Sequence, residues 1–268
     1  MSASSEAIEP AVTSERVGDV VVLTLNLPEQ RNAMTERMTA DWAAAVAAVA
    51  GDDTVRCVVV TGAGSAFCAG GDLSFLGDNA TFSADALEAR MLSFYGTWLA
   101  FRELPVPTIA AVNGPAVGAG LALALACDLR YATAQAAFSV PFSGLGIYPG
   151  MAATRLLPQA VGVAAAREML LTGRVVRGEE TVRLGLVNGI FDAHDLRDRV
   201  LEIAATIAAK APIATRLTTL ALRDGGPASV ASALETEVRA QPQTMLSADL
   251  QEGLAARRER RKPRFAGQ

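Results

Sequence analysis

Hydrophobic and polar residues in the first quarter of the chain follow the periods of a strand, a helix and a second strand. Residues 17–25 alternate with period two, which predicts a half-buried strand. Large apolar residues recur at helical spacing over residues 34–49, and the pattern stops at Gly51, a residue that suits a helix end. Residues 55–62 are almost wholly apolar, which is typical of a strand buried on both faces of a sheet. A strand, a helix and a strand in this order indicate a parallel crossover unit.

Strand and helix patterns continue to about residue 200, where the strand signals cease. Residues 77–90 are polar and predict a loop, which leads into a helix over residues 86–104. Further strands are predicted at residues 107–114, 129–140 and 187–191, with short helices at residues 151–162, 164–173 and from 179. From Asp195 on, the chain is Ala-rich and helical. We therefore expect an α/β fold with a flexible tail over residues 1–14, a core over 15–200 and a helical region over 201–268.

Composition and charge narrow the class of protein. The chain has 51% hydrophobic and 19% charged residues, which indicates a folded rather than a disordered protein. Its net charge of −4 disfavours a nucleic-acid binder, although residues 257–264 (RRERRKPR) are locally basic. Residues 104–127 are uncharged, but three prolines and an Asn-Gly pair would interrupt a helix there, so we predict no membrane span. The opening residues show neither a secretory signal nor a lipidation motif.

Cysteine and histidine usage argues against metal and disulfide chemistry. Cys57, Cys68 and Cys127 lie in apolar surroundings without paired spacing, which predicts buried, reduced thiols in a cytoplasmic protein. The single histidine, His194, lies at a predicted helix start, where an exposed turn residue is commoner than a general base. One histidine with scattered cysteines does not form a transition-metal site. We therefore predict no bound metal.

Two familiar glycine motifs are incomplete in this chain. Gly62 and Gly64 follow a predicted strand as in a dinucleotide-binding loop, but Phe67 stands where the third glycine belongs. Ser143 lacks the first glycine of the nucleophile turn of serine hydrolases. Nicotinamide and serine-hydrolase chemistry are both disfavoured.

Two other glycine-rich segments are more informative together than either is alone. They are GSAFCAGGDL (residues 64–73) and AAVNGPAVGAGLALALACDLRYA (residues 110–132), and glycine lets bare backbone approach a ligand closely. Four further segments accompany them in order: NLPEQRNAMT (26–35), GIYPGMAATRLLPQAVG (146–162), TGRVVRGEETVRLGLVNGIF (172–191) and EGLAARRERRKPRF (252–265). With these motifs the chain resembles the crotonase superfamily, the enoyl-CoA hydratase/isomerase family, from about residue 15 to its end.

The resemblance implies a fold, a ligand and an oxyanion hole. The fold would be a crotonase-type spiral of repeated ββα units, with residues 15–200 binding an acyl-CoA thioester and residues 201–268 forming a helical oligomerisation region. The backbone N–H groups of Gly71 and Ala119 would hold the thioester oxygen as negative charge develops on it. Ala119 would lie at a helix N-terminus, which favours an anion. Coenzyme A would be part of the substrate, and no other cofactor is implied.

The resemblance also assigns contacts to the coenzyme and to neighbouring subunits. Backbone at Ala33, Ala69, Asp72 and Leu73 would contact the adenine and pantetheine, and Arg31 would contact a phosphate. Family members assemble as trimers or dimers of trimers, in which a cation of the C-terminal tail reaches the neighbour's coenzyme. Arg260 falls at that position. The alternative for each arginine of the tail is a solvated helix end.

This chain departs from the family pattern at the acid–base residues. Hydratases of the family use two glutamates, and Ala122 and Phe142 stand in their places. Isomerases keep the second glutamate or place an aspartate near the position of Gly150. The polar residues expected near the thioester are Ser139, Ser143, Tyr148 and, from the loop, Asp78, among which Tyr148 is a candidate proton donor. Phe142 with Met151 predicts an apolar pocket for the acyl group.

Three hypotheses remain from the sequence. The first is a crotonase-family enzyme that acts on an acyl-CoA through a residue other than glutamate, in a reaction such as isomerisation, decarboxylation, thioester hydrolysis or carbon–carbon cleavage. The second is a catalytically silent acyl-CoA carrier or sensor. The third is a scaffold with a vestigial pocket, against which the preserved coenzyme motifs argue.

Overall fold

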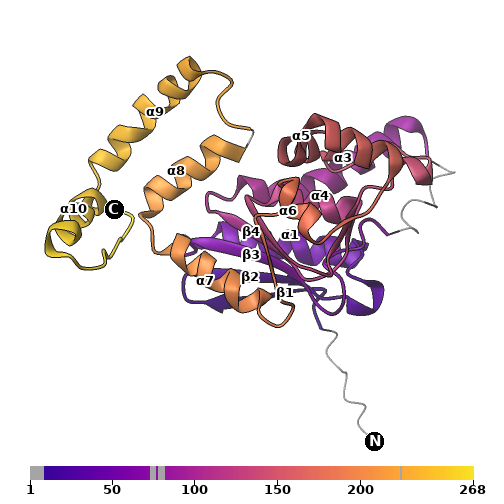
Figure 1. The fold of residues 1–268 in the computed structure, drawn as a ribbon, viewed down its shortest axis with the longest axis horizontal. Coiled ribbons are helices and arrows are strands. Elements are labelled where there is room, and N and C mark those ends of the chain that lie inside the picture. The colour runs from indigo at the N-terminus through magenta and orange to yellow at the C-terminus, as the bar shows by residue number, and fades with distance from the viewer. Residues whose placement is uncertain (1–8, 73–76, 78–81, 224) are drawn as a thin grey trace, which may run out of the picture.

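A mostly parallel sheet and a smaller second sheet form the core of the computed structural model, which describes residues 9–72, 77, 82–223 and 225–268 (Figure 1). The large sheet has the strand order β1-β2-β3-β4-β6-β9 within these residues. Its strands are β1 (Val12–Val17), β2 (Val20–Leu25), β3 (Cys57–Gly62), β4 (Thr108–Val112), β6 (Leu129–Thr133) and β9 (Gly189–Phe191). Only the β1–β2 pair is antiparallel among the pairs described in this sheet.

The second sheet produces a repeating ββα pattern. It contains β5 (Ala116–Val117), β7 (Ala137–Ser139) and β8 (Val176–Arg177) in the order β5-β7-β8. The chain runs from β4 through β5 into helix α4 (Ala119–Ala126), and from β6 through β7 into helix α5 (Ala153–Thr172). Each unit therefore places one strand in each sheet before its helix. This arrangement confirms the predicted α/β spiral of ββα units.

The remaining helices surround the sheets and extend the C-terminal part. They are α1 (Glu36–Ala50), α3 (Ala84–Leu99), α6 (Glu179–Arg183), α7 (Leu196–Ala208), α8 (Pro212–Arg223), α9 (Val230–Met245) and α10 (Ala248–Glu259), with 3-10 turns η1 (Pro28–Gln30), η3 (Ala100–Glu103) and η4 (Ser143–Leu145). The two short helices predicted between residues 151 and 173 form α5, interrupted at Gly162, whose φ of 75° is not helical. The helix predicted over residues 86–104 begins earlier, because Ser83 caps it, and its last turn tightens into η3. No helix in the part of the chain described is long and apolar enough to span a membrane.

The strand predicted over residues 17–25 is wrong in two respects. The chain turns at Gly18, so that Val17 ends β1 and β2 starts at Val20. β2 is also buried on both faces rather than on one. Helix α1 and helix α7 both contact β2, so every side chain but Thr24 is buried, which fits the uninterrupted apolar run over residues 20–23 rather than an alternating pattern.

Stacked aromatic side chains fix α3 against α1. The rings of Trp42 and Trp98 lie 5.1 Å apart at 17°, and Phe101 meets Trp42 edge-on. Both indole N–H groups donate hydrogen bonds, from Trp42 to the carbonyl of Trp98 and from Trp98 to the hydroxyl of Thr39. Because these contacts anchor the C-terminal half of α3, the residues one and two turns earlier are held in a defined position.

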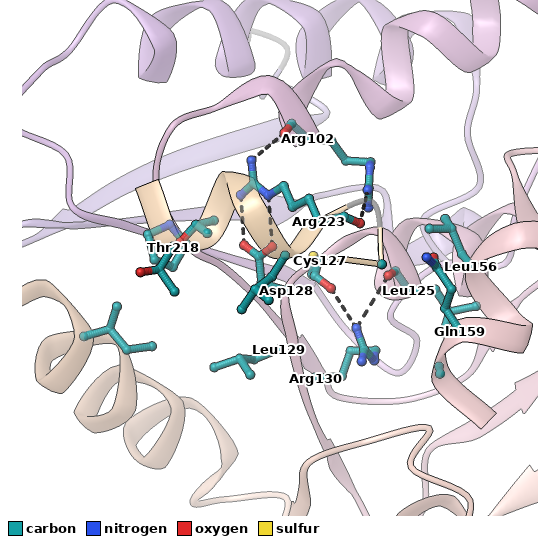
Figure 2. Close-up of a pocket in the computed structure, with 16 residues that line it drawn as sticks. Arg102, Leu125, Cys127, Asp128, Leu129, Arg130, Leu156, Gln159, Thr218 and Arg223 are labelled. Atoms are coloured by element: carbon teal, nitrogen blue, oxygen red, sulfur yellow. Dashed lines mark hydrogen bonds and ion pairs between the residues drawn. The ribbon is translucent and has the colours of Figure 1, made fainter. Parts of the chain in front are cut away.

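The C-terminal helices divide into a part on the sheet and a part that extends away from it. Helix α7 packs on the large sheet, so the boundary expected between residues 200 and 201 falls inside a helix of the core. Helices α8 to α10 lie to one side of the sheets in Figure 1. Arg223 at the end of α8 ties them to the core through an ion pair of 2.8 Å with Asp128, drawn in Figure 2. The helical region predicted beyond residue 200 is present.

The chain end folds back onto α10 through two carboxylates. The buried Asp249 accepts hydrogen bonds from the backbone of Ala266 and Gly267. Glu252 pairs with Arg261 and accepts a hydrogen bond of 2.7 Å from the backbone N–H of Arg264. These contacts place the basic tail beside α10.

We expect the contact between Glu252 and Arg264 to persist far into the acid range. The hydrogen bonds from Arg261 and from the backbone of Arg264 lower the pKa of Glu252 from 4.5 to about 2. A carboxylate with a lowered pKa stabilises the folded tail above its ordinary pKa, and that contribution is lost as the pH falls towards 2. The amide shift of Arg264, followed by NMR, should therefore titrate near pH 2 and not at all in Glu252→Gln. A midpoint near 4.5 would contradict the pairing.

Candidate functional site

A cavity of about 490 Å³ opens between the glycine-rich segments, α3 and the loop before α5. Its lining comprises Gln30, Ala33, Ala69, Gly70, Gly71, Asp72, Met91, Phe94, Tyr95, Val117, Gly118, Ala119, Pro141, Phe142, Leu145, Ile147, Tyr148, Gly150 and Met151. Most of these residues are apolar or contribute only backbone. The sequence-predicted residues Gly71, Ala119, Ala33, Ala69, Asp72, Phe142, Tyr148 and Met151 are thus brought together.

Close backbone packing joins the two glycine-rich segments. The N–H of Val117 donates to the carbonyl of Cys68 at 3.0 Å, and a β-bridge pairs Cys68 with Ala116. A Cβ at Gly120 would collide with the Cys68 carbonyl, so only glycine allows α4 to lie this close. The backbones of these two segments, which are distant in sequence, must lie in contact, and this explains why both segments are rich in glycine.

The backbone N–H groups of Gly71 and Ala119 face the same cavity without a partner. Neither N–H donates a hydrogen bond within the described part of the chain. Ala119 is the first residue of α4, after Gly118 with a φ of 55°, and the first N–H groups of a helix have no partner inside it. The dipole of α4 adds a positive potential at this point. Two free donors beside a helix N-terminus form a site for a negatively charged oxygen.

The RNAM segment is fixed beside the first glycine-rich segment. The N–H of Ala69 donates to the carbonyl of Arg31 at 2.9 Å, and the N–H of Met34 donates to the carbonyl of Gly70 at 2.8 Å. The side chain of the fully buried Asn32 bonds to the carbonyls of Ala63 and Ala66. These contacts place Ala33 and Ala69 in the cavity wall, whereas Arg31 is exposed and outside it.

Two predicted coenzyme contacts are placed elsewhere or not described. Leu73 lies outside the described residues, as does Asp78 of the loop. Arg260 caps α10 with a φ of 54° and is exposed. Because α10 lies far from α3 in Figure 1, Arg260 cannot reach the cavity of its own chain. Its predicted role stays tied to a neighbouring subunit.

Apolar side chains occupy the positions of the two family glutamates. Ala122 is fully buried one turn into α4, and its N–H donates to the carbonyl of Gly118 at 3.0 Å. The ring of Phe142 lies 3.7 Å from the point where a Cβ of Gly118 would stand. Phe142 therefore lies against the N-cap of α4 and belongs to the cavity wall, whereas Ala122 does not. The apolar pocket predicted from Phe142 and Met151 agrees with this arrangement.

Tyr95 is a candidate site residue that the sequence analysis missed. It lies in the cavity wall on α3, beside Phe94 and one turn after Met91. Burial raises its pKa above the usual value, so the phenol is protonated at neutral pH. Tyr148 also lines the cavity, but 81% of its surface is exposed, so water competes for its hydroxyl. The signal in the sequence was a hydroxyl-bearing aromatic within the apolar stripe Met91, Phe94, Tyr95 and Trp98.

Cysteine side chains do not reach this cavity. Cys57, Cys68 and Cys127 are unpaired and buried, as predicted. Burial raises the pKa of each thiol to about 12, which disfavours the reactive thiolate. His194 is exposed on a surface turn beside Asp195.

A second cavity, of about 570 Å³, lies between α8 and the core and is drawn in Figure 2. Its charged side chains are engaged in structural contacts. Arg223 pairs with Asp128, Arg102 donates to the carbonyl of Arg223 at 2.7 Å, and Arg130 donates to the carbonyl of Cys127 at 2.7 Å. This cavity is larger, but its guanidinium groups hold α8 and the chain turns in place, so the first cavity is the better candidate.

Comparisons with known proteins identify the relatives of this chain. The family model for enoyl-CoA hydratase/isomerase matches residues 15–268. Crotonyl-CoA hydratase from Syntrophomonas wolfei is 35% identical over 254 residues, covering 94% of this chain and 96% of that protein. Probable enoyl-CoA hydratase EchA14 from Mycobacterium tuberculosis is 47% identical over 190 residues, covering 71% and 72%. The crystal structure of enoyl-CoA hydratase from Bacillus anthracis has a TM-score of 0.88 at 32% identity, covering 96% of this chain and 100% of that one.

Proposed function

The chain belongs to the enoyl-CoA hydratase/isomerase family, and on that premise we propose that it binds an acyl-CoA thioester and stabilises the enolate of the acyl group, as a lyase or isomerase. The observation that carries the proposal is the pair of unpartnered N–H groups, Gly71 and Ala119, in one largely apolar cavity. Coenzyme A enters as part of the substrate, and the proposal requires no other cofactor.

The geometry supports a specific division of work. The thioester oxygen would accept hydrogen bonds from Gly71 and Ala119, so that negative charge on an enolate meets donors already in place. The apolar wall around Phe142 and Met151 would exclude water and hold the acyl chain. The backbone of Ala33 and Ala69 would run along the coenzyme at the cavity edge.

Hydration by two glutamates does not fit this chain. A water molecule attacking the acyl group must lose a proton, and general acid–base catalysis contributes about 10²–10⁴-fold to such steps. Ala122 and Phe142 supply no titratable group at either position. The proposal therefore assigns the chain to reactions that proceed from an enolate without this pair.

Calorimetry with coenzyme A, butyryl-CoA and crotonyl-CoA tests the proposal. We expect butyryl-CoA to bind at least about tenfold more tightly than free coenzyme A, because each buried CH₂ contributes roughly 0.8 kcal/mol. Hydration of crotonyl-CoA, followed by its absorbance, should be slow, and mass spectrometry of acyl-CoA mixtures should identify the reaction that is turned over. Equal affinity for coenzyme A and butyryl-CoA would overturn the proposal.

A catalytically silent carrier is the second candidate function. The apolar residues at both glutamate positions favour it, because binding needs only the oxyanion hole and the apolar wall. Tight acyl-CoA binding without turnover of any substrate in the mixture would support this alternative.

We also propose that residues 201–268 include the surface on which the chain assembles with copies of itself, as a trimer or a dimer of trimers. Val230, Leu234, Val238 and Met245 are exposed large apolar side chains of α9. Their spacing places them on one stripe of the helix. Exposure of such an apolar stripe to water is unfavourable, so we expect another copy of the chain to cover it.

A charge in this stripe is expected to break the assembly. Leu234→Asp should shift the mass measured by light scattering from the assembled species to the single chain, because an unpaired carboxylate is costly at an apolar interface. Arg239→Asp, which changes a charge of α9 outside the stripe, should leave the mass unchanged. Identical masses for Leu234→Asp and the unmodified protein would show that α9 is not the interface.

A further inference from the structure

The hydroxyl of Tyr95 has no hydrogen-bond partner among the described residues, although its side chain lies in the cavity wall. Its neighbours on α3, Met91 and Phe94, are apolar and line the same cavity. The stacking of Trp42 on Trp98 holds this helix one turn further on. Helix α3 thus presents a hydroxyl between apolar side chains of the cavity wall.

Gly150 provides the space that the hydroxyl occupies. A Cβ at position 150 would collide with the Tyr95 hydroxyl and would lie 2.9 Å from the ring carbon that bears it. The φ of Gly150 is not positive, so the backbone does not require glycine there. The volume of Tyr95 therefore explains why position 150 is a glycine, although the two residues are 55 positions apart in the sequence.

An unpaired hydroxyl among apolar side chains makes the cavity selective once an acyl chain displaces the water around it. A hydrocarbon ligand leaves the polar group of such a site without a hydrogen-bond partner. A ligand that supplies the partner therefore binds more tightly. A protonated phenol is both a donor and an acceptor, so it can pair with a hydroxyl or an oxo oxygen. Tyr148 is less suited to this selection because 81% of its surface is exposed, so a ligand in the cavity would displace less of the water around it.

We propose that Tyr95 is a specificity-determining residue that hydrogen-bonds an oxygen on the acyl chain, and that the substrates are acyl-CoA thioesters carrying a hydroxyl or oxo group beyond the thioester. This inference rests on the proposed acyl-CoA function. It assigns the thioester oxygen to Gly71 and Ala119 and the second oxygen to Tyr95. Two fixed points then orient the acyl chain in the cavity.

The test compares affinities for acyl-CoAs that differ in one oxygen. Butyryl-CoA, 3-oxobutyryl-CoA, 3-hydroxybutyryl-CoA and 4-hydroxybutyryl-CoA are titrated by calorimetry into the full-length protein and into Tyr95→Phe. We expect Tyr95→Phe to weaken at least one oxygenated ligand by about 3- to 10-fold, the value of one neutral hydrogen bond, without weakening butyryl-CoA. The ratio of the two affinities is the readout, since a purely structural role of Tyr95 would weaken all four ligands together.

Two further variants distinguish the effect of the Tyr95 hydroxyl on affinity from an effect of the substitution on the fold. Gly150→Ala keeps the hydroxyl but displaces it, and should reproduce the selective loss. Tyr131→Phe removes a hydroxyl from β6, where the ring stacks on Phe191 away from the cavity, and should change no affinity. Unchanged affinity ratios in Tyr95→Phe would overturn the inference. Failure of the unmodified protein to bind butyryl-CoA would instead remove the proposed function on which the inference rests.

Discussion

Replacing Ala119 with proline is expected to reduce the ionisation of bound 3-oxobutyryl-CoA by about 10- to 100-fold, because one hydrogen bond to a charged oxygen is worth roughly 1.5–3 kcal/mol. The substitution removes the N–H that faces the cavity and little else. Ala119 is the first residue of α4, where proline fits the helix and where the N–H has no helical partner. The enolate of a 3-oxoacyl thioester absorbs at longer wavelength than its neutral form, so absorbance at fixed pH measures the effect without knowledge of the natural reaction.

The matched control is Ala119→Ser, which enlarges the side chain and keeps the N–H. It should ionise the ligand as the unmodified protein does. Circular dichroism and thermal unfolding must show that the proline variant keeps α4. A folded Ala119→Pro protein that ionises 3-oxobutyryl-CoA normally would show that this N–H does not hold the oxygen, and the oxyanion hole would have to be sought elsewhere.

The same contrast between backbone and side chain explains which parts of the site could be predicted from the sequence. Gly71 and Ala119 lie in short glycine-rich segments that match a family pattern, so the sequence alone predicts both residues. Tyr95 follows no motif. Its significance depends on Gly150, which is distant in sequence, and on a cavity that only the tertiary fold creates.

The errors in the predicted fold have identifiable causes in particular segments. The prediction of a half-buried β2 failed because the run over residues 20–23 is apolar without alternation, and α1 and α7, the latter more than 170 residues later, both contact it. The end predicted for α3 failed for a local reason, the tightening of its last turn into η3. The crossover units and the buried β3 were predicted correctly because their apolar periodicity is strong within a single segment.

The two family glutamate positions should be changed together, because Ala122 is fully buried and Phe142 lies beside Gly118, whose carbonyl accepts the N–H of Ala122. Ala122→Glu alone is expected to lower the free energy of unfolding by about 3 kcal/mol or more, since it buries a carboxyl without a partner in a filled core. Urea denaturation measures this loss. In the double variant Ala122→Glu with Phe142→Glu, removal of the ring creates space beside the N-terminus of α4, so part of the stability should return.

That double variant is also expected to gain hydratase activity on crotonyl-CoA, by about 10²-fold or more over the unmodified protein, because it supplies the acid and the base that the chain lacks. The control is the double variant with glutamine at both positions, which has nearly the same shape but cannot transfer protons. If the glutamate pair folds, binds crotonyl-CoA and still hydrates no faster than the glutamine pair, the cavity has diverged in its geometry as well as at these two side chains. In that case, the acyl-chain oxygen that we propose to bond to Tyr95, rather than an attacking water molecule, would be the next group to test as the reacting one.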